Sequence, residues 1–551
     1  MDYTQTNSGT LGTERPIFYI LAASLGTAFE WYDFFLYTAV APVFAKQFFG
    51  TLDSNVSYLF ALLAFAAGFA VRPLGAVFFG RLGDVWGRKN IFLATMLTMG
   101  TATVAVGLLP TSHTIGLAAP VLLVVARICQ GFAVGGEYGG AAVYIAERAP
   151  EGQRGYYTSF IQVTCTFGLA LALIAVLLTR KIVGEVNFQQ WAWRVPFLLS
   201  AALVVVSLWI RLNLAESPVF KSLLTLNILS SAPLAESFSK SNRARLFLAT
   251  FGLTAGMTVI FYNSQVYSAF FLEKVLRVDG QTVNFAVTCA LLAATPFFVI
   301  FGSLSDKYGR KTIIVAACLL AAVGYMPLFK AMAVTANPAL VAATRAAPVT
   351  IVAPPNECSL QFDLIGRATL LTSCDIAKSA LATSGVSYNF EDGPVGQATL
   401  IKIGNTTVEG FPGKIGGATA LISERDSLIA LIKTTLHSQG YPSEASKISP
   451  ATFIKIVGIL FAMVLLVTMA YGPLAAILVE MFPPRIRTTS LSISYNTAVG
   501  LLGGFLPAVA FVIVIVTGNI FAGLWYPISV AAFGGIVSLF FVKDDRTMTS
   551  I

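Results

Sequence analysis

Long apolar stretches alternate with short polar segments along the whole of this 551-residue chain. Twelve stretches are about 20 residues long or longer, which is enough for a helix to cross a hydrocarbon layer about 30 Å thick. We expect spanning helices at residues 17–42, 57–80, 91–110, 117–146, 156–179, 194–212, 245–271, 284–304, 312–333, 451–479, 487–515 and 519–542. The pattern therefore predicts an all-α membrane protein with twelve transmembrane helices.

The composition excludes a soluble protein. Hydrophobic residues make up 56% of the chain and charged residues 11%, whereas soluble domains contain about 25% charged residues. The net charge of +9 does not indicate a nucleic-acid partner, because fifteen Lys and Arg residues lie in loops of one predicted side and five in the short loops of the other. This bias places the richer loops and both termini in the cytoplasm, with membrane lipid around the helices.

Two polar motifs each occur twice. GRLGDVWGRK at residues 80–89 returns as GSLSDKYGRK at 302–311, and both are interpreted as short cytoplasmic turns between helices. ERAPEGQR at 147–154 has the spacing of EMFPPRIR at 480–487. The first copies begin 67 residues apart and the second copies 178. Two related halves are therefore expected, the second longer by about 111 residues.

The repeat divides the chain into four parts. Residues 1–212 are expected to form an amino-terminal six-helix bundle, 213–244 a cytoplasmic linker, and 245–333 with 451–551 a carboxyl-terminal six-helix bundle. Residues 334–450 are the extra segment, which follows the ninth helix and therefore lies outside. Its prolines, short β-branched runs and glycine-rich breaks predict a small strand-containing periplasmic insert.

The six cysteines show no metal-ligand spacing, and no metal or other cofactor is expected. Four of them lie in apolar runs, where buried thiols are the usual state: Cys129, Cys165, Cys289 and Cys318. The insert contains the other two, Cys358 and Cys374, with 15 residues between them. In an oxidising periplasm these two are expected to form a disulfide, and two free thiols are the alternative.

In their order along the chain, these motifs resemble the major facilitator superfamily. GRLGDVWGRK with its repeat, RICQGFAVGGEYGG in the fourth predicted helix and ERAPEGQRG after it carry the resemblance. FEWYDFFLY in the first helix and FPPRIRTTSLS at the start of the eleventh are similar to its metabolite:proton symporter branch. The resemblance implies two bundles around a central cavity, alternating access with proton-coupled uptake, and a monomer in a bacterial inner membrane. The insert departs from the family pattern.

Carboxylates inside the predicted helices are the candidates for proton coupling, because both histidines, His113 and His437, fall in predicted outer loops. Glu30 and Asp33 lie three residues apart on one face of the first helix, and Tyr37 follows four residues later. Glu30 is interpreted either as a hydrogen-bonding neighbour of the site or as a proton carrier.

Arg127 in the fourth helix lies at nearly the depth of Asp33, roughly 10 Å and 12 Å from the outer helix ends at 1.5 Å per residue. We hypothesise that these two side chains face each other across the amino-terminal half of the cavity. A proton on Asp33 would free the planar guanidinium of Arg127 to bind an anionic solute. The alternative is a permanent buried ion pair that orients two helices.

Other polar residues are weaker candidates. Glu137 is interpreted either as a proton relay or gate residue or as an acid bound to a cationic loop. In the carboxyl-terminal half, hydroxyl and amide side chains are available to face a solute, although each is equally suited to interhelical hydrogen bonding: Tyr262, Asn263, Gln265, Tyr495 and Asn496.

The repeated motifs are interpreted as a cytoplasmic gate. The resemblance implies that Asp84 and Asp306 bridge to adjacent helix ends when the cytoplasmic side is closed, and loop anchoring is the alternative. The expected gate residues are Gly80, Asp84, Gly87, Arg88, Lys89, Glu147, Arg154, Asp306, Arg310, Lys311, Glu480 and Arg487.

A proton-coupled secondary transporter that imports a small organic solute is the leading prediction, with a carboxylate as the favoured class. A zwitterionic osmolyte such as betaine or proline is the main alternative, and a transporter-derived sensor is the third. An enzyme is not expected, because the chain shows no nucleophile and base pairing, no metal-ligand spacing and no phosphate-binding loop.

Overall fold

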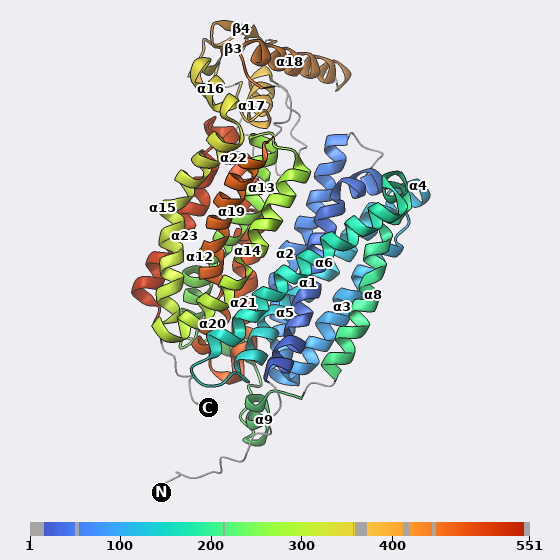
Figure 1. The fold of residues 1–551 in the computed structure, drawn as a ribbon, viewed down its shortest axis with the longest axis vertical. Helices are drawn as coiled ribbons and strands as arrows, with labels where there is room; N and C mark the ends of the chain where they lie inside the picture. Colours follow the sequence, from blue (N-terminus) through green and yellow to red (C-terminus); the bar gives the residue numbers. More distant parts are fainter. Residues whose placement is uncertain are drawn as a thin grey trace.

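The computed structural model of the protein describes residues 16–49, 54–212, 215–355, 357–358, 372–411, 418–442 and 448–544. It consists of two helical bundles with a small module at the outer end of one of them (Figure 1). The ribbons of the two bundles lie close together at the end away from the module and separate toward it (Figure 1).

The amino-terminal bundle contains six long helices, which are α1 (Pro16–Phe49), α2 (Ser54–Trp86), α3 (Arg88–Leu108), α5 (Ala118–Ala146), α6 (Arg154–Val183) and α8 (Arg194–Leu212). Three short elements lie in its connections: α4 (Ser112–Ile115), α7 (Glu185–Asn187) and the π-helix η1 (Phe188–Ala192). The chain bends by 62° between η1 and α8.

The carboxyl-terminal bundle begins with a helix run that is interrupted by three π-helical segments: α11 (Arg243–Phe247), η2 (Leu248–Thr254), α12 (Ala255–Tyr262), η3 (Asn263–Tyr267), α13 (Ser268–Phe270) and η4 (Phe271–Val275). It continues with α14 (Gly280–Tyr308), α15 (Arg310–Ala336), α19 (Pro450–Tyr471), α20 (Leu474–Met481), η5 (Pro484–Ile486), α21 (Arg487–Ala498), η6 (Val499–Gly503), α22 (Leu506–Thr517), η7 (Ala522–Leu524) and α23 (Trp525–Phe541). Two short helices, α9 (Pro218–Thr225) and α10 (Pro233–Ser237), lie between the bundles in the chain.

Twelve helix runs have the length to cross a membrane. Nine runs within the described residues are long and apolar enough to do so, and the bent run through η1 and α8 is a tenth. With α1 and α2, which are 34 and 33 residues long, the count is twelve. The predicted all-α fold with twelve transmembrane helices is confirmed.

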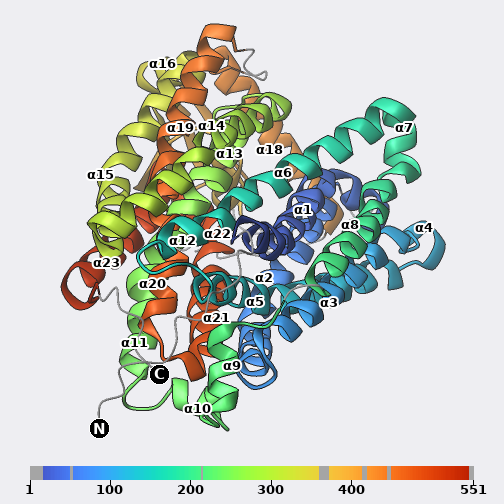
Figure 2. The same ribbon diagram turned by 60° about the horizontal axis from the view of Figure 1, so that its bottom comes forward.

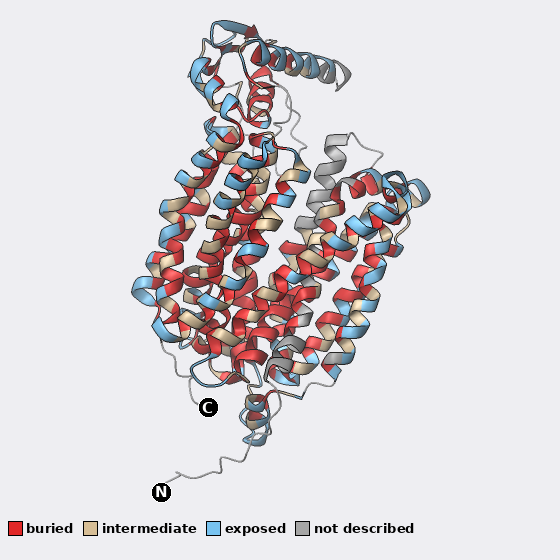
Figure 3. Ribbon diagram, in the orientation of Figure 1, coloured by how far each residue is buried: buried red, intermediate tan, exposed pale blue. Residues whose placement is uncertain are grey.

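The two bundles meet at the end opposite the module. There α2 and α5 pack against α21, and α6 packs against α14; Figure 2, turned so that this end comes forward, shows α2 and α5 beside α21. Buried residues are concentrated in this region, whereas the outward faces of the helices carry many exposed side chains (Figure 3). Large apolar residues such as Leu122, Ile174 and Leu177 are among those exposed, as expected of a surface that lipid covers.

The expectation of four buried thiols is wrong for two cysteines. Cys165 and Cys318 are buried, but Cys129 is exposed and Cys289 is partly exposed. An apolar run in a membrane helix does not reveal which face points inward, because lipid and protein core are both apolar.

The interpretation of residues 80–89 and 302–311 as short turns is also wrong in part. Asp84 lies in the last turns of α2 and Asp306 in those of α14. Only Gly87 and Gly309 leave the helical conformation, with φ of 103° and 102°. Glycine adopts these positive φ values without steric penalty, so a single residue reverses the chain and the next helix starts at once.

The outer module contains a mixed four-stranded sheet and three helices, so the expectation of a small strand-containing insert is confirmed. The strands are β1 (Val349–Ala353), β2 (Tyr388–Asp392), β3 (Leu400–Ile403) and β4 (Thr406–Glu409), and the helices are α16 (Pro338–Ala346), α17 (Ser373–Thr383) and α18 (Ala418–Ser438). The sheet order is β2-β1-β3-β4. Because β1 and β2 are parallel, a hairpin cannot join them, and α17 lies in the crossover between them.

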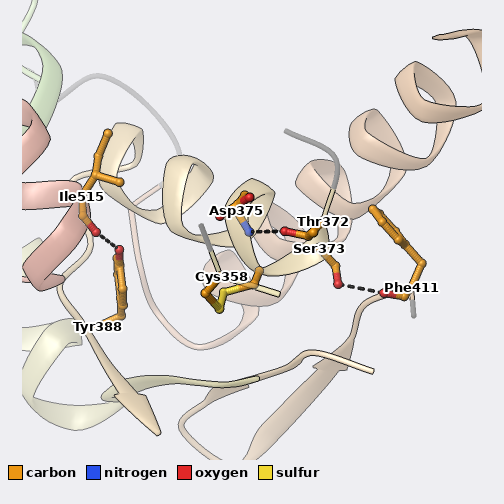
Figure 4. Close-up of a disulfide and its surroundings, with 8 residues drawn as sticks. Cys358, Thr372, Ser373, Asp375, Tyr388, Phe411 and Ile515 are labelled. Carbon is orange, nitrogen blue, oxygen red and sulfur yellow. Dashed lines mark hydrogen bonds between the residues drawn. A yellow bond between two sulfur atoms is a disulfide. The ribbon is translucent and has the colours of Figure 1, made fainter. Parts of the chain in front are cut away.

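A disulfide joins Cys358 and Cys374, so the segment after β1 is linked to the first turn of α17 (Figure 4). The module also contacts the carboxyl-terminal bundle directly. The Tyr388 backbone N–H donates to the Gly518 carbonyl over 2.7 Å, and the Tyr388 hydroxyl donates to the Ile515 carbonyl (Figure 4). The module is therefore fastened both internally and to the end of α22.

Candidate transport site and cytoplasmic gate

Asp33 and Arg127 form a buried ion pair in the amino-terminal bundle. Arg127 Nη1 of α5 lies 3.2 Å from Asp33 Oδ2 of α1, and both side chains are about 6% exposed. The two side chains are in direct contact and do not face each other across a cavity, a geometry that fits both the proposed coupling pair and the alternative of a permanent buried ion pair. The guanidinium also lies 4.2 Å from the centre of the Tyr37 ring, a cation–π geometry.

Two side chains that the sequence analysis missed complete this cluster. Gln130 Nε2 donates to Asp33 Oδ1 over 2.9 Å and to Thr103 Oγ1 of α3 over 2.9 Å, while Gln130 Oε1 accepts from Arg127 Nη1 over 2.8 Å. The position of Gln130, one helical turn after Arg127, was a signal that it shares the same face of α5. No local pattern indicated Thr103. We call these four residues, Asp33, Thr103, Arg127 and Gln130, the polar cluster.

The polar cluster borders a small pocket inside the amino-terminal bundle. Asp33 and Thr103 line it together with Glu137, Met99 and Ser200, so it is enclosed by α1, α3, α5 and α8. The Asp33 side chain therefore borders a space of about 10 Å³, which is close to the smallest that holds one water molecule. A proton-accepting group needs this kind of access.

Glu137 pairs with a cation that belongs to a helix and not to a loop. Glu137 Oε1 lies 3.3 Å from Arg211 Nη2, and both side chains are 1% exposed. Arg211 belongs to the last turn of α8, donates to the Phe92 carbonyl over 3.0 Å and lies over the Phe92 ring. The partner of Glu137 is therefore a helix residue and not part of a cationic loop, and α8 ends at Leu212, where the predicted span 194–212 also ends.

The candidates of the carboxyl-terminal half divide into two groups. Tyr262, Tyr495 and Asn496 contact the other bundle, since Tyr262 packs on Phe69, Tyr495 stacks on Tyr138 at 3.8 Å, and Asn496 Nδ2 donates to the Gly135 carbonyl over 2.8 Å. The other two, Asn263 and Gln265, are buried in η3. The side chain of Glu30 lies outside the described part of the structure.

Asp84 binds the start of a helix in the opposite bundle. Its two carboxylate oxygens accept the backbone N–H groups of Thr488 and Thr489, over 3.1 and 2.8 Å, and the Thr489 hydroxyl over 2.7 Å. These are the second and third residues of α21, where backbone N–H groups have no partner within the helix. Gly80 lies one helical turn before Asp84 and permits the approach, because a Cβ there would lie 3.0 Å from Thr489 Cα.

Asp306 makes the equivalent contact in the reverse direction. Its carboxylate accepts the backbone N–H groups of Gly155 and Tyr156, both over 2.8 Å, at the second and third residues of α6. Arg310 Nη1, at the start of α15 and four positions after Asp306, lies 2.8 Å from Asp306 Oδ1. Each bundle therefore caps a helix of the other with a carboxylate.

In the second pair of motifs, the acid of each copy forms an ion pair with the arginine of the other copy, across the two bundles. Arg487 Nη1 lies 3.0 Å from Glu147 Oε1, and Arg154 Nη1 lies 3.3 Å from Glu480 Oε1. Arg310 donates two further hydrogen bonds to Glu480, from Nε to Oε2 over 2.5 Å and from Nη2 to Oε1 over 2.6 Å. These charges are almost completely buried, so an extended network of ion pairs holds the bundles together at the end opposite the outer module.

The remaining gate candidates differ in their contacts. Arg88 is fully buried, lies 3.5 Å from Asp84 and 3.6 Å from Glu147, and donates to the Pro484 carbonyl over 2.8 Å. Lys89 instead donates to the Leu212 carbonyl at the end of α8. Lys311 forms no ion pair with the residues that the structure describes, whereas its neighbour Arg310 pairs with Asp306 and Glu480 of the same bundle.

Comparisons with known proteins agree with this geometry. A family model described as "Sugar (and other) transporter" matches residues 19–225. The alpha-ketoglutarate permease of Escherichia coli (strain K12) is 35% identical over 326 residues, which are 59% of this chain and 74% of the permease. The proline/betaine transporter of the same strain is 35% identical over 321 residues, which are 56% of this chain but only 63% of that transporter.

A solved structure shares the fold. The proton:xylose symporter XylE superposes with a TM-score of 0.61 over 96% of both chains, at 15% sequence identity. The helix count, the repeated gate motifs and these matches lead to one assignment. The chain belongs to the major facilitator superfamily, in its metabolite:proton symporter branch.

Proposed function

We propose that this protein is a proton-coupled symporter that imports a small organic anion, most simply a carboxylate, by alternating access. The observation that carries the proposal is the buried contact of Asp33 with Arg127 and Gln130 in the polar cluster. In the proposed mechanism Asp33 carries the proton and Arg127 binds the negative end of the solute.

The coupling follows from the cost of a buried unpaired charge. Protonation of Asp33 removes the negative partner of Arg127, and an uncompensated buried charge costs several kcal/mol. An anionic solute that pairs with Arg127 removes this penalty. Proton and anion therefore favour each other's binding, which is the condition for symport.

The gate contacts support the alternating-access part of the proposal. With Asp84 and Asp306 capping opposite helices, the cytoplasmic side is held shut, and transport requires both caps to be released. Release is favourable only if the loaded carrier gains comparable free energy in the inward-facing state. We propose that this free energy comes from the polar cluster once Asp33 is protonated and the solute is bound.

A zwitterionic osmolyte is the second candidate, because aromatic rings gather where the bundles meet. The ring centres of Trp31 in α1 and Phe261 in α12 are 5.4 Å apart, and those of Phe261 and Tyr471 in α19 are also 5.4 Å apart. Aromatic faces attract quaternary ammonium groups. The carboxylate of betaine would then pair with Arg127. One relative is named for α-ketoglutarate and another for proline and betaine, so similarity supports either class.

The topology is part of the proposal. We place residues 1–212, and 245–333 with 451–551, in the membrane as two bundles joined by a cytoplasmic linker at 213–244, with 334–450 outside. Both termini are cytoplasmic, and the protein works as a monomer in a bacterial inner membrane. The distribution of Lys and Arg supports this orientation.

Uptake into proteoliposomes tests the function. Under an imposed inward proton gradient, purified protein should accumulate radiolabelled α-ketoglutarate or succinate, and a protonophore should abolish the accumulation. Asp33→Asn should remove the stimulation by the gradient, whereas Asp426→Asn on the exposed surface of α18 should behave as wild type. Stronger accumulation of betaine would select the second candidate. No accumulation of either class would refute transport of both and leave a sensor as the better description.

A further inference from the structure

A second polar cavity lies at the outer end of the carboxyl-terminal bundle, between the bundle and the outer module. Its volume is about 590 Å³, within the range of about 300–1,000 Å³ that is usual for small-molecule sites. Its walls come from the segment after η4, the start of α14, and helices α16, α17 and α18. None of these elements contributes to the polar cluster. We propose that this outer cavity binds a small organic anion with a carboxylate group, at a site separate from the transport site.

Basic side chains from both the bundle and the module line the cavity. Arg277 comes from the bundle, between η4 and α14, while Lys433 and His437 come from α18 of the module. Lys433 and His437 are four residues apart and therefore share one face of the helix. An anion between them would be approached from two sides by groups that donate hydrogen bonds.

The acidic residues at the cavity are already engaged in other contacts. Glu273 pairs with Lys274 at 2.7 Å. Asp279 caps the start of α14, where its Oδ2 accepts the backbone N–H and the hydroxyl of Thr282 over 3.0 and 3.1 Å. The carboxylates are therefore occupied locally, and three Lys and Arg side chains line the cavity against these two acids, so the lining is basic on balance.

Arg277 is held in place by the fold. Its backbone has φ of 56°, a left-handed conformation that costs free energy in a residue other than glycine. Arg277 Nη1 donates to the Pro442 carbonyl over 2.9 Å, which ties the end of the module to the bundle. Burial lowers the pKa of Arg277, because the charged guanidinium is desolvated. A bound anion would offset that desolvation.

The rest of the lining identifies the ligand class. Leu340, Val386 and Leu436 are buried apolar residues, and Thr383 and Ser384 supply hydroxyl groups at the end of α17. Lys433, His437 and the two hydroxyl groups can donate hydrogen bonds to a carboxylate. A wall that combines these donors with apolar side chains suits an organic acid with a short carbon skeleton better than an inorganic ion. A bound acid would link the module to the end of the seventh helix run.

The chain contains only two histidines, and this permits a direct test. His437 lines the cavity, whereas His113 lies in α4 of the other bundle and serves as an internal reference. Full-length protein with ¹³C-labelled histidine, purified without a histidine tag, should give two ring resonances, which His437→Gln assigns. Succinate should shift the His437 resonance saturably and leave that of His113 in place.

Variants locate the bound anion. Lys433→Gln should raise the half-saturating succinate concentration at least tenfold, whereas Lys402→Gln, an exposed lysine of β3 away from the cavity, should change it less than twofold. Arg127→Gln should leave the His437 shift as in wild type, even if it abolishes transport. The proposal is overturned if succinate produces no saturable shift, if Lys433→Gln and Lys402→Gln behave alike, or if Arg127→Gln removes the shift. It is also overturned if sulfate at equal ionic strength reproduces the shift at the same concentration.

Discussion

Asp84 and Asp306 make the same contact from opposite bundles. Each carboxylate accepts two backbone N–H groups at the second and third residues of a helix in the other bundle, α21 for Asp84 and α6 for Asp306. The two copies of the motif therefore form two near-symmetric clasps, which hold the bundles together at the end opposite the outer module. A negative charge at the amino end of a helix is favourable, and this contact exists only while the bundles are together.

Asparagine at position 84 or 306 should weaken the closed state. The amide keeps the size of the carboxylate but loses the charge and one acceptor, which removes about 1–2 kcal/mol per site. The ratio of closed to open cytoplasmic sides should fall about tenfold for Asp84→Asn. Spin labels at Glu151→Cys and Tyr308→Cys, in a background without the four free cysteines, measure this ratio as a distance distribution.

The two clasps should act additively, because they involve separate sets of residues. The double variant Asp84→Asn/Asp306→Asn should therefore open the cytoplasmic side further than either single change. A closed distance that persists in the double variant would show that the ion-pair network alone keeps the bundles together.

Gly139 should be intolerant of a methyl group, whereas its neighbour Gly140 should accept one. A Cβ at Gly139 of α5 would lie 3.1 Å from Ser492 Cβ and 3.2 Å from Ser492 Cα of α21, across the interface between the bundles. A Cβ at Gly140 would lie 3.6 Å or more from the Phe92 ring, an ordinary contact. Gly139→Ala should therefore favour separation of the cytoplasmic ends, because that removes the clash.

The same pair of spin labels measures the effect of these alanines. Gly140→Ala is the matched control, since it adds the same methyl group to the same helix on a different face. Equal distance distributions for the two variants would show that the close approach at Gly139 does not control how tightly the two bundles come together.

Arg127→Lys should reduce solute affinity while preserving the charge. A lysine cannot hold Asp33 and Gln130 with a planar fork, and it offers an anion a single charged nitrogen. We expect the half-saturating solute concentration to rise about tenfold, equivalent to about 1.4 kcal/mol. Initial uptake rates in proteoliposomes measure this change, and Arg425→Lys on the exposed face of α18 is the control for expression and insertion. An unchanged half-saturation would exclude Arg127 from the solute site.

Loss of the disulfide should loosen the outer module. Cys358 and Cys374 are separated by 16 positions, and closing a loop of about 15 residues is worth about 3 kcal/mol in the chain-entropy model. Cys358→Ser/Cys374→Ser should make proteolysis within the module about 100-fold faster, if cleavage follows the population of the opened form. Cys129→Ser, which removes an exposed thiol from α5, should leave the rate unchanged. Equal cleavage rates would mean that the sheet and its contacts with α22 suffice to hold the module.

The sequence by itself determined the twelve crossings, the duplication and the position of the insert. Twenty apolar residues in succession have one solution in a bilayer, which is a helix, so length alone predicts each span. The common depth of Asp33 and Arg127 was also readable, because the rise per residue converts position along a helix into distance.

Only the tertiary structure decided which residues meet. Thr103 joins Gln130, Glu147 pairs with Arg487, and Lys433 faces the same cavity as Arg277, although each pair is far apart in the chain. Helical spacing sets the depth of a side chain but not the rotation of its helix or the choice of neighbouring helix. In a membrane protein the sequence does not reveal this choice, because the helix faces toward lipid and toward protein are both apolar. Shape and hydrogen bonds select the neighbouring helix instead.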